Sequence, residues 1–125
     1  MKILWLGIFI AGALGAIARY QQGRFVGNRF SGLLPLGTLS INLLGSFFVG
    51  LLVGYLQKKF LSPNLFSILD LGFAGAYTTF SSMSYETVRL IEQNLVIESF
   101  IYPILSLIFG LLAVQTGLYL SSGVL

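Results

Sequence analysis

Apolar residues dominate four stretches of this chain, and each stretch has about the length of a membrane crossing. A transmembrane helix needs about 20 mainly apolar residues. The four stretches are residues 3–19, 36–57, 64–88 and 98–121. Short segments join them, the longest being QQGRFVGNRFSGLLP at 21–35. The pattern predicts an all-α membrane protein with four transmembrane helices in one domain, 1–125.

Small residues recur four positions apart in three of these stretches. This spacing places them on one face of a helix, where they let another helix backbone approach closely. The residues are Gly7, Ala11 and Gly15, then Ser46, Gly50 and Gly54, then Ala113 and Gly117. Two interpretations stay open. The stripes pack within one subunit, or they join subunits, because four short helices enclose little interior for polar groups.

The third stretch contains an unusually polar segment, GAYTTFSSMSYE at 75–86. Gly72 and Gly75 weaken a helix, and the β-branched pair Thr78 and Thr79 follows them. These residues predict a break in the third helix near 75–79. Irregular backbone at membrane depth is tolerated only where it is buried in protein or lines a cavity, and the carbonyl groups that it frees can hold a cation.

The second stretch carries Thr38, Asn42 and Ser46 on one helical face, because they are spaced four apart. A hydroxyl in a membrane helix often bonds back to the carbonyl four residues earlier. The Asn42 amide has two donors and an acceptor, which local bonds do not satisfy. Asn42 is therefore either a hydrogen-bonding contact between helices or a donor that faces a permeating anion.

Further polar candidates have two interpretations each. Arg19 is a flanking residue that extends toward water, or a fixed positive charge that concentrates anions. Phe80 and Met83 share a helical face, as ordinary core residues do, whereas Ser81 and Ser84 form a polar face.

The fourth stretch places Tyr102, Ser106 and Gly110 four residues apart. Tyr102 is an anchor at the membrane interface or a part of a polar lining. Glu86, nearly one turn beyond Met83, is solvated at the interface or belongs to the same lining. Most of these polar groups are hydrogen-bond donors. They favour a pathway for an anion without identifying the anion.

Composition places the chain in a bilayer. It is 56% hydrophobic and only 9% charged, whereas a soluble domain carries about 25% charged residues. Its net charge of +3 comes from scattered Lys and Arg, which argues against nucleic-acid binding. The sequence has no Cys and no His. Disulfides, thiolate metal sites and a histidine proton shuttle are therefore excluded.

The basic residues divide almost evenly between the two sides of the predicted membrane protein. One side carries Lys2, Lys58 and Lys59, and the other carries Arg19, Arg24, Arg29 and Arg89. Because the excess of Lys and Arg orients a membrane protein, three against four gives almost no bias. The charges are compatible with one orientation set by other details, or with insertion in both orientations and antiparallel pairing of two copies.

Three segments together resemble the small fluoride channels called Fluc or CrcB. They are GALGAIARY at 12–20, PLGTLSINLLGSFFVG at 35–50 and GFAGAYTTFSSMSYE at 72–86. The resemblance implies a channel rather than an enzyme. It would export fluoride passively across the cytoplasmic membrane of a prokaryote and relieve fluoride toxicity. It also implies an antiparallel homodimer in the lipid bilayer, with two pores and a central structural sodium ion.

The resemblance also assigns residues. Backbone carbonyls of Gly75 and Thr78 match the positions that bind sodium, and the ring edge of Phe80 matches a position that meets fluoride. The implied fluoride pathway comprises Arg19, Thr38, Asn42, Phe80, Ser81, Met83, Ser84, Glu86, Tyr102 and Ser106. Met83 departs from the family pattern TTFSxFS, which has a second Phe there. A thioether has no ring edge, so this change bears on conduction rate and selectivity.

Two other functions compete with the channel. A small proton-coupled multidrug exporter also has four short spans and pairs in opposed orientations, but it needs an acid in the membrane. Asp70 and Glu86 are the only candidates for this acid, because the other three predicted spans have no internal acid except Glu98 at a rim. A non-transporting assembly subunit, held together by the glycine stripes, is the second alternative.

Overall fold

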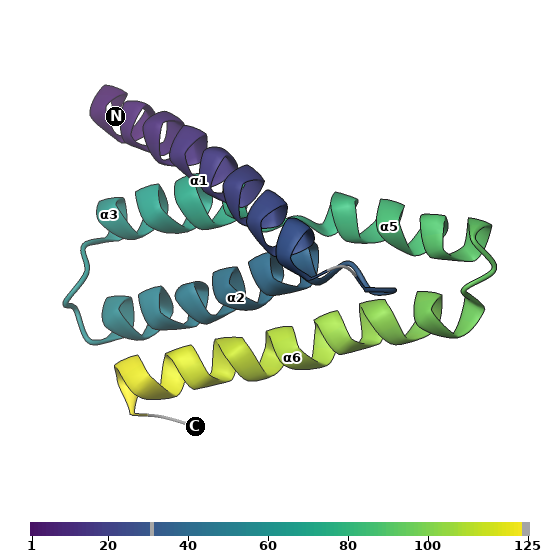
Figure 1. Cartoon of the computed structure of the whole chain (residues 1–125). Helices are drawn as coiled ribbons and strands as arrows, with labels where there is room; N and C mark the ends of the chain where they lie inside the picture. Colours follow the sequence, from purple (N-terminus) through teal and green to yellow (C-terminus); the bar gives the residue numbers. More distant parts are fainter. Residues whose placement is uncertain (31, 124–125) are drawn as a thin grey trace.

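A computed structural model describes residues 1–30 and 32–123 as helices joined by short turns (Figure 1). The part of the chain that it describes contains no β-strand, so the predicted all-α class is confirmed. The helices are α1 (Lys2–Arg29), α2 (Leu36–Gln57), α3 (Pro63–Ser67), the π-helix η1 (Ile68–Ala74), α4 (Gly75–Tyr77), α5 (Phe80–Glu92) and α6 (Val96–Ser122).

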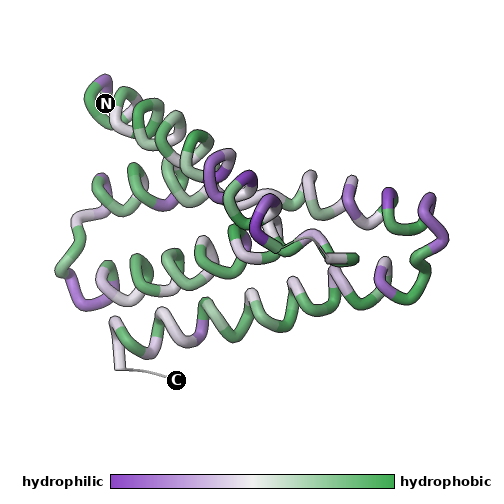
Figure 2. Tube along the Cα trace, in the orientation of Figure 1, coloured by the Kyte–Doolittle hydropathy of each residue, from purple (hydrophilic) through white to green (hydrophobic). Residues whose placement is uncertain are grey.

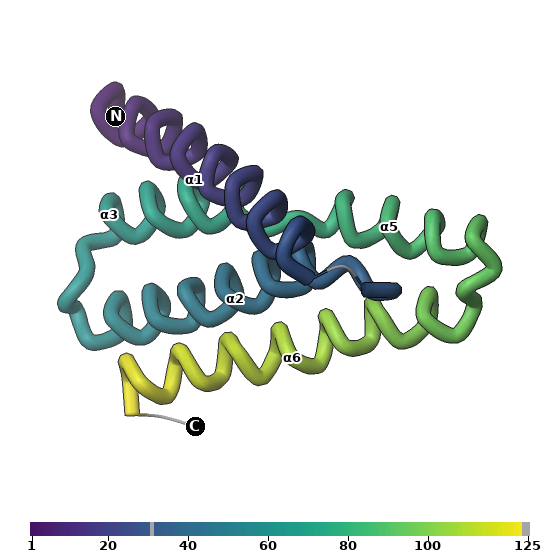
Figure 3. Tube along the Cα trace, viewed as in Figure 1, coloured from purple at the N-terminus to yellow at the C-terminus, as the bar shows by residue number. Residues whose placement is uncertain are grey.

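Within the described residues, three continuous helices are long and apolar enough to cross a membrane, namely α1, α2 and α6. The third predicted crossing consists of α3, η1, α4 and α5, which follow one another along one line with an interruption between α4 and α5 (Figure 3). Residues 78 and 79 form this interruption. The predicted break near 75–79 is therefore confirmed.

The predicted bounds differ most at the end of the first helix. The segment 21–35 was expected to be a connection, but α1 continues through it as far as Arg29. No Pro interrupts this segment before Pro35. The polar residue Gln22 also gains partners there, because its Nε2 donates to the Ser40 hydroxyl and its Oε1 accepts from the Tyr77 hydroxyl. Polar composition marked the edge of the apolar run and did not end the helix.

Helices α2 and α6 run parallel and lie side by side (Figures 1 and 3). Their small residues make the contact: a Cβ atom on Gly50 would lie 2.2 Å from the Val114 carbonyl oxygen, and one on Gly117 would lie 2.2 Å from the Phe47 carbonyl oxygen. Side chains at these positions would push the helices apart. The stripes of the second and fourth stretches therefore pack against each other within one chain.

Helix α1 crosses the third segment diagonally (Figure 1). Its stripe of small residues faces η1, where a Cβ atom on Gly15 would lie 2.3 Å from the Phe73 carbonyl oxygen. Gly72 of η1 approaches Ala11 and the Ile8 backbone in the same way, since its Cβ atom would lie 2.9 Å from each. Close backbone approach thus holds α2 against α6 and α1 against η1.

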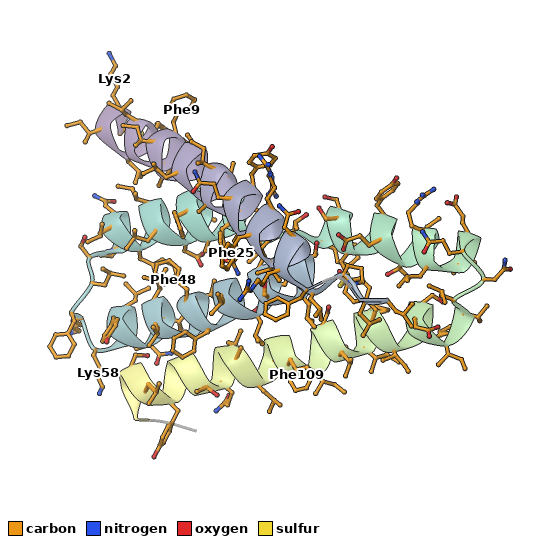
Figure 4. All side chains as sticks on the ribbon, in the orientation of Figure 1. Lys2, Phe9, Phe25, Phe48, Lys58 and Phe109 are labelled. Atoms are coloured by element: carbon orange, nitrogen blue, oxygen red, sulfur yellow. The ribbon has the colours of Figure 1, made fainter. Side chains whose placement is uncertain are left out.

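Most of the remaining surface is apolar. Hydrophobic colouring covers α2, α6 and the first half of α1, whereas polar residues gather toward the end of α1 and along α5 (Figure 2). Phe9 points away from the other helices and is 74% exposed, and Lys2 and Lys58 lie at the same end of the molecule (Figure 4). Such a surface suits lipid better than water.

Candidate functional site

The break in the third helix is a two-residue extended segment. Thr78 has φ −75° and ψ 158°, and Thr79 has φ −152° and ψ 110°. The glycines that were expected to open the helix do not do so, because Gly72 lies within η1 and Gly75 has helical angles. The β-branched threonines form the break. β-Branched residues such as these prefer extended backbone to the interior of a helix.

Asn42 of α2 holds this segment by both polar atoms of its side-chain amide. Its Nδ2 donates to the Thr79 carbonyl at 3.1 Å, and its Oδ1 accepts from the Thr79 N–H at 2.8 Å. This is the contact between helices that one interpretation of Asn42 predicted. One hydrogen on Nδ2 remains after these two bonds. Donation from Asn42 to a permeating anion stays a prediction.

The hydroxyls next to the break organise the start of α5. Thr79 Oγ1 accepts from the Ser82 N–H at 3.1 Å as an N-cap, donates to Ser82 Oγ at 2.9 Å and lies 3.3 Å from Ser81 Oγ. Ser84 bonds back to the Phe80 carbonyl at 3.0 Å. Of the two predicted serines, Ser81 therefore lies at the break, whereas Ser84 lies one turn along α5.

Arg19 lies beside the break, within α1. Its Nη1 donates to the Thr78 carbonyl at 3.4 Å, so Arg19 contacts the break and does not only extend toward water. The same side chain lines a groove of about 320 Å³ together with Arg24, Thr38, Thr79 and Ser82. A positive charge and several hydroxyls thus line one groove beside the break, and this groove is large enough to hold water molecules.

Glu86 is not solvated alone, as one interpretation had it. Its carboxylate accepts from Thr38 Oγ1 at 2.7 Å and from the Tyr102 hydroxyl at 2.5 Å. Thr38 therefore does not bond back along its own helix, and Tyr102, whose side chain is fully buried, is no anchor at the membrane interface. These three residues join α2, α5 and α6 through one carboxylate.

Ser106 lies one turn beyond Tyr102 on α6. It is buried, and its hydroxyl has no hydrogen-bond partner among the residues that the structure describes. Buried polar atoms nearly always have a partner. The parallel packing of α2 and α6 pairs Ser46 with Gly110, since a Cβ atom on Gly110 would lie 3.6 Å from Ser46 Oγ. One turn earlier on both helices, the same pairing brings Ser106 to the level of Asn42.

A second groove brings the aromatic and amide candidates together. It has a volume of about 330 Å³, and its lining residues are Asn42, Ser46, Val49, Thr78, Thr79, Phe80, Met83 and Val114. Phe80 and Met83 share this lining, as their spacing predicted. The side chain of Phe80 is 78% exposed. Phe80 is therefore no core residue of the single chain.

The predicted sodium ligands fit a monovalent cation. In a continuous helix the Gly75 carbonyl would accept from the Thr79 N–H, but that N–H is bonded to Asn42. Thr78 is extended, and its carbonyl accepts from Arg19 Nη1 at 3.4 Å. The described residues contain no cluster of three acidic side chains for a metal. Neutral backbone oxygens suit sodium better than a divalent ion.

Sequence reasoning missed three residues that build the site. Thr79 is both the partner of Asn42 and the N-cap of α5, and a Thr directly before an apolar residue that begins a helix was an available signal. Tyr77 and Gln22 bond to each other across the third segment and α1. No local pattern predicts that pairing, because the two residues are far apart in the sequence.

A broken helix held by a half-buried amide, with a charged groove and an aromatic groove on its flanks, defines this molecule as a small helical membrane transport protein. The chain belongs to the CrcB family. The family model described as "CrcB-like protein, Camphor Resistance (CrcB)" matches residues 6–118. The suspected resemblance is thereby confirmed over nearly the whole chain.

Curated relatives extend the match. A protein of Gloeothece citriformis named "Fluoride-specific ion channel FluC" is 41% identical over 113 residues, which cover 90% of this chain and 92% of the relative. A protein of Moorella thermoacetica named "Fluoride-specific ion channel FluC 2" is 41% identical and covers 95% of this chain and 96% of its own. One from Acidobacterium capsulatum is 40% identical, with 94% coverage of both. With α1, α2 and α6, these bacterial relatives identify a multi-pass membrane protein of prokaryotic type.

Proposed function

We propose that this chain is a fluoride channel of the cytoplasmic membrane, and not an enzyme, and that it conducts fluoride passively as an antiparallel homodimer with two pores. The observation that carries the proposal is the groove at the break, which brings Asn42, Phe80 and Met83 together. Family membership and the names of the relatives support fluoride as the transported ion.

The chemistry of fluoride suits this lining. Fluoride is small and strongly hydrated, so a pore must replace its water with dense hydrogen-bond donors. The remaining hydrogen of the Asn42 amide and the Ser106 hydroxyl, which has no partner among the described residues, supply donors at one level. The edge of an aromatic ring carries partial positive charge, and Phe80 presents its ring to the groove. Met83 adds an apolar, adaptable wall there.

The Glu86 cluster gives the pathway a second donor position. Thr38 and Tyr102 direct their hydroxyl hydrogens at the carboxylate, and Thr38 and Glu86 both line a further groove of about 370 Å³. Fluoride that enters there competes with the carboxylate for these two hydrogens. Arg19 and Arg24 in the neighbouring groove raise the local anion concentration.

An antiparallel partner is supported by the surface of the third segment. Leu71 and Phe80 are 66% and 78% exposed, and Gly75 is exposed with them. Irregular backbone at membrane depth needs protein or water beside it, and a second copy supplies that cover. The near balance of basic residues favours copies in both orientations. Adding two Lys next to Lys59 should bias insertion and impair transport, whereas wild-type termini that all label from one side would contradict antiparallel pairing.

Sodium is the proposed structural cofactor at the dimer axis. Carbonyls of Gly75 and Thr78 from each copy would hold it, which gives four neutral oxygens around one monovalent ion. The ion supplies positive charge that offsets the cost of anions in a low dielectric. Arg19 already donates to the Thr78 carbonyl and orients that group from the side of α1.

Fluoride efflux from proteoliposomes tests the transport function. We expect electrogenic efflux of fluoride down its gradient, with no need for a proton gradient and with little chloride efflux under the same conditions. A requirement for a proton gradient would indicate the exporter. Absence of flux from a correctly assembled protein would indicate the assembly subunit. Empty liposomes and liposomes with an ionophore set the two limits of the signal.

A further inference from the structure

We infer that Asn42 is a positioning residue for the cation site: it keeps the Gly75 carbonyl available by taking the hydrogen bond that Thr79 would otherwise give to that carbonyl. This inference rests on the sodium site in the proposed function. It adds a second role to Asn42, which links the anion pathway to the cation site through one side chain.

The hydrogen-bond ladder of the third segment ends at one peptide group. The Thr78 N–H still follows the helical rule and donates to the Ala74 carbonyl at 3.0 Å. The next N–H in line, that of Thr79, would donate to the Gly75 carbonyl in a continuous helix. It donates to Asn42 Oδ1 at 2.8 Å instead. One side-chain oxygen therefore stands where the helix would have used a carbonyl.

Asn42 also fixes the other side of the same residue. Its Nδ2 donates to the Thr79 carbonyl at 3.1 Å, and this second bond holds the extended conformation of Thr79. The Thr79 hydroxyl caps α5 through Ser82, but it does not provide an acceptor for the Thr79 N–H. Asn42 is therefore the group whose acceptor replaces the bond from Thr79 to Gly75.

Asn42 lies on a helix that packs tightly against the break. One turn along α2 from Asn42, a Cβ atom on Gly45 would lie 2.2 Å from Thr78 Cγ2 and 3.1 Å from Tyr77 Cδ1. This close approach fixes the distance between α2 and the break. Without the Asn42 amide, a buried N–H would have no acceptor, which is costly at membrane depth. The Gly75 carbonyl is the acceptor that the helix ladder offers it, and the cation would lose a ligand.

The response of thermal stability to sodium tests this inference in the purified full-length protein. Melting is measured in sodium chloride and in N-methyl-D-glucamine chloride at equal ionic strength. We expect sodium to raise the melting temperature of the wild type by about 5 °C, a typical shift for a ligand that binds only the folded state. Asn42→Leu, which has a similar size and no acceptor, should lose this shift.

Two variants separate the acceptor from other effects. Asn42→Asp keeps an acceptor for the Thr79 N–H and loses the bond from Nδ2 to the Thr79 carbonyl; it should keep the sodium shift, because the acceptor is the group that the inference requires. Ser46→Ala removes a polar group from the same groove without touching the break, and it should also keep the shift. If Asn42→Leu does not fold, the comparison is made after replacement of Thr79 by its α-hydroxy acid, so that the weaker ester carbonyl of Thr78, a proposed ligand, is common to both proteins. The ester has no N–H to close the ladder, so Asn42→Leu in this background should keep the sodium shift of the ester protein that retains Asn42.

The outcomes distinguish this inference from the proposal on which it rests. A wild-type protein that does not respond to sodium removes the cation site, and this inference falls with it. A wild type that responds, together with an Asn42→Leu protein that responds equally, overturns the inference alone. Loss of the shift on Asn42→Leu in the ester background also overturns it, because Asn42 would then act only by holding the backbone conformation.

Discussion

The close contact between α2 and α6, here called the seam, and the break between α4 and α5 satisfy their backbone hydrogen bonds in opposite ways. Along the seam, two regular helices satisfy their own backbone hydrogen bonds and meet through Gly50, Gly54 and Gly117. At the break, the helix gives up its own bonds. Side chains from two other helices, Asn42 and Arg19, bond to the backbone of residues 78 and 79.

The difference separates packing from function. The seam needs the absence of side chains, and its Ser121 hydroxyl bonds to the Gly117 carbonyl within it. The break needs particular polar side chains, and its residues line two grooves. Substitutions in the seam should therefore change stability first, whereas substitutions around the break should change transport first.

Gly50→Ala should have the largest effect. Its Cβ atom would lie 2.2 Å from the Val114 carbonyl oxygen, and only a backbone shift relieves that overlap. We expect a loss of about 3 kcal/mol of stability, at the upper end for overpacking, measured by thermal unfolding in detergent. Gly27→Ala is the matched control, since a Cβ atom there meets nothing within 4 Å. Equal stability of the two variants would contradict the tight seam.

Asn42→Asp should stop transport while the protein stays assembled. The substitution keeps the acceptor for the Thr79 N–H and puts a negative charge in the proposed anion pathway. We expect fluoride efflux to fall more than about 100-fold, since each tenfold loss in rate corresponds to only about 1.4 kcal/mol of barrier. Size-exclusion chromatography should show the same assembly as the wild type. Normal conduction by this variant would reduce Asn42 to a contact between helices.

Phe80→Ile should lower fluoride efflux by about fivefold, because it removes the ring edge from the groove; loss of one such favourable contact is worth about 1 kcal/mol. Met83→Ile should cost less, since Met83 has no ring edge to lose. Met83→Phe should be tolerated, because it restores the family pattern. The three variants are compared at equal protein density in liposomes. Wild-type efflux from Phe80→Ile would leave Phe80 as a packing residue of the dimer.

Ser106→Ala and Ser121→Ala should show the smallest effects and the clearest contrast. The Ser121 hydroxyl lies 2.8 Å from the Gly117 carbonyl within the seam, so its loss should cost about 1 kcal/mol of stability without changing efflux. The Ser106 hydroxyl has no partner in the described residues. Its loss should leave stability unchanged and lower efflux by about threefold, the value of one modest hydrogen bond. The reverse assignment would contradict the separation of seam and break.

Much of the fold follows from local pattern. The bounds predicted for the second helix, 36–57, coincide with α2, because its apolar run is bounded by Pro35 and by Lys58. The end of the first helix at Arg29 was not predictable from hydropathy. Its polar residues find partners on α2 and on the third segment, and these contacts are invisible in the sequence of α1 alone.

The site divides in the same manner. Composition and spacing predicted a break near 75–79, and they predicted that Phe80 and Met83 share a face. They did not predict that Glu86 would join Thr38 to Tyr102 or that Ser106 would be left without a partner. Those relations depend on the parallel register of α2 and α6, which is set by contacts between residues about 64 positions apart.

The sequence by itself therefore determined the membrane class, the number of crossings, the family resemblance and the approximate position of the break. Each of these depends on residue types within one helix length, so each can be predicted from the length of a bilayer crossing and the period of a helix. Only the tertiary structure decided which peptide group breaks the ladder. The N–H of Thr79 is that group, because Asn42 accepts its hydrogen bond. The close approach of Gly45 to Thr78 fixes the position of Asn42 on α2 beside it.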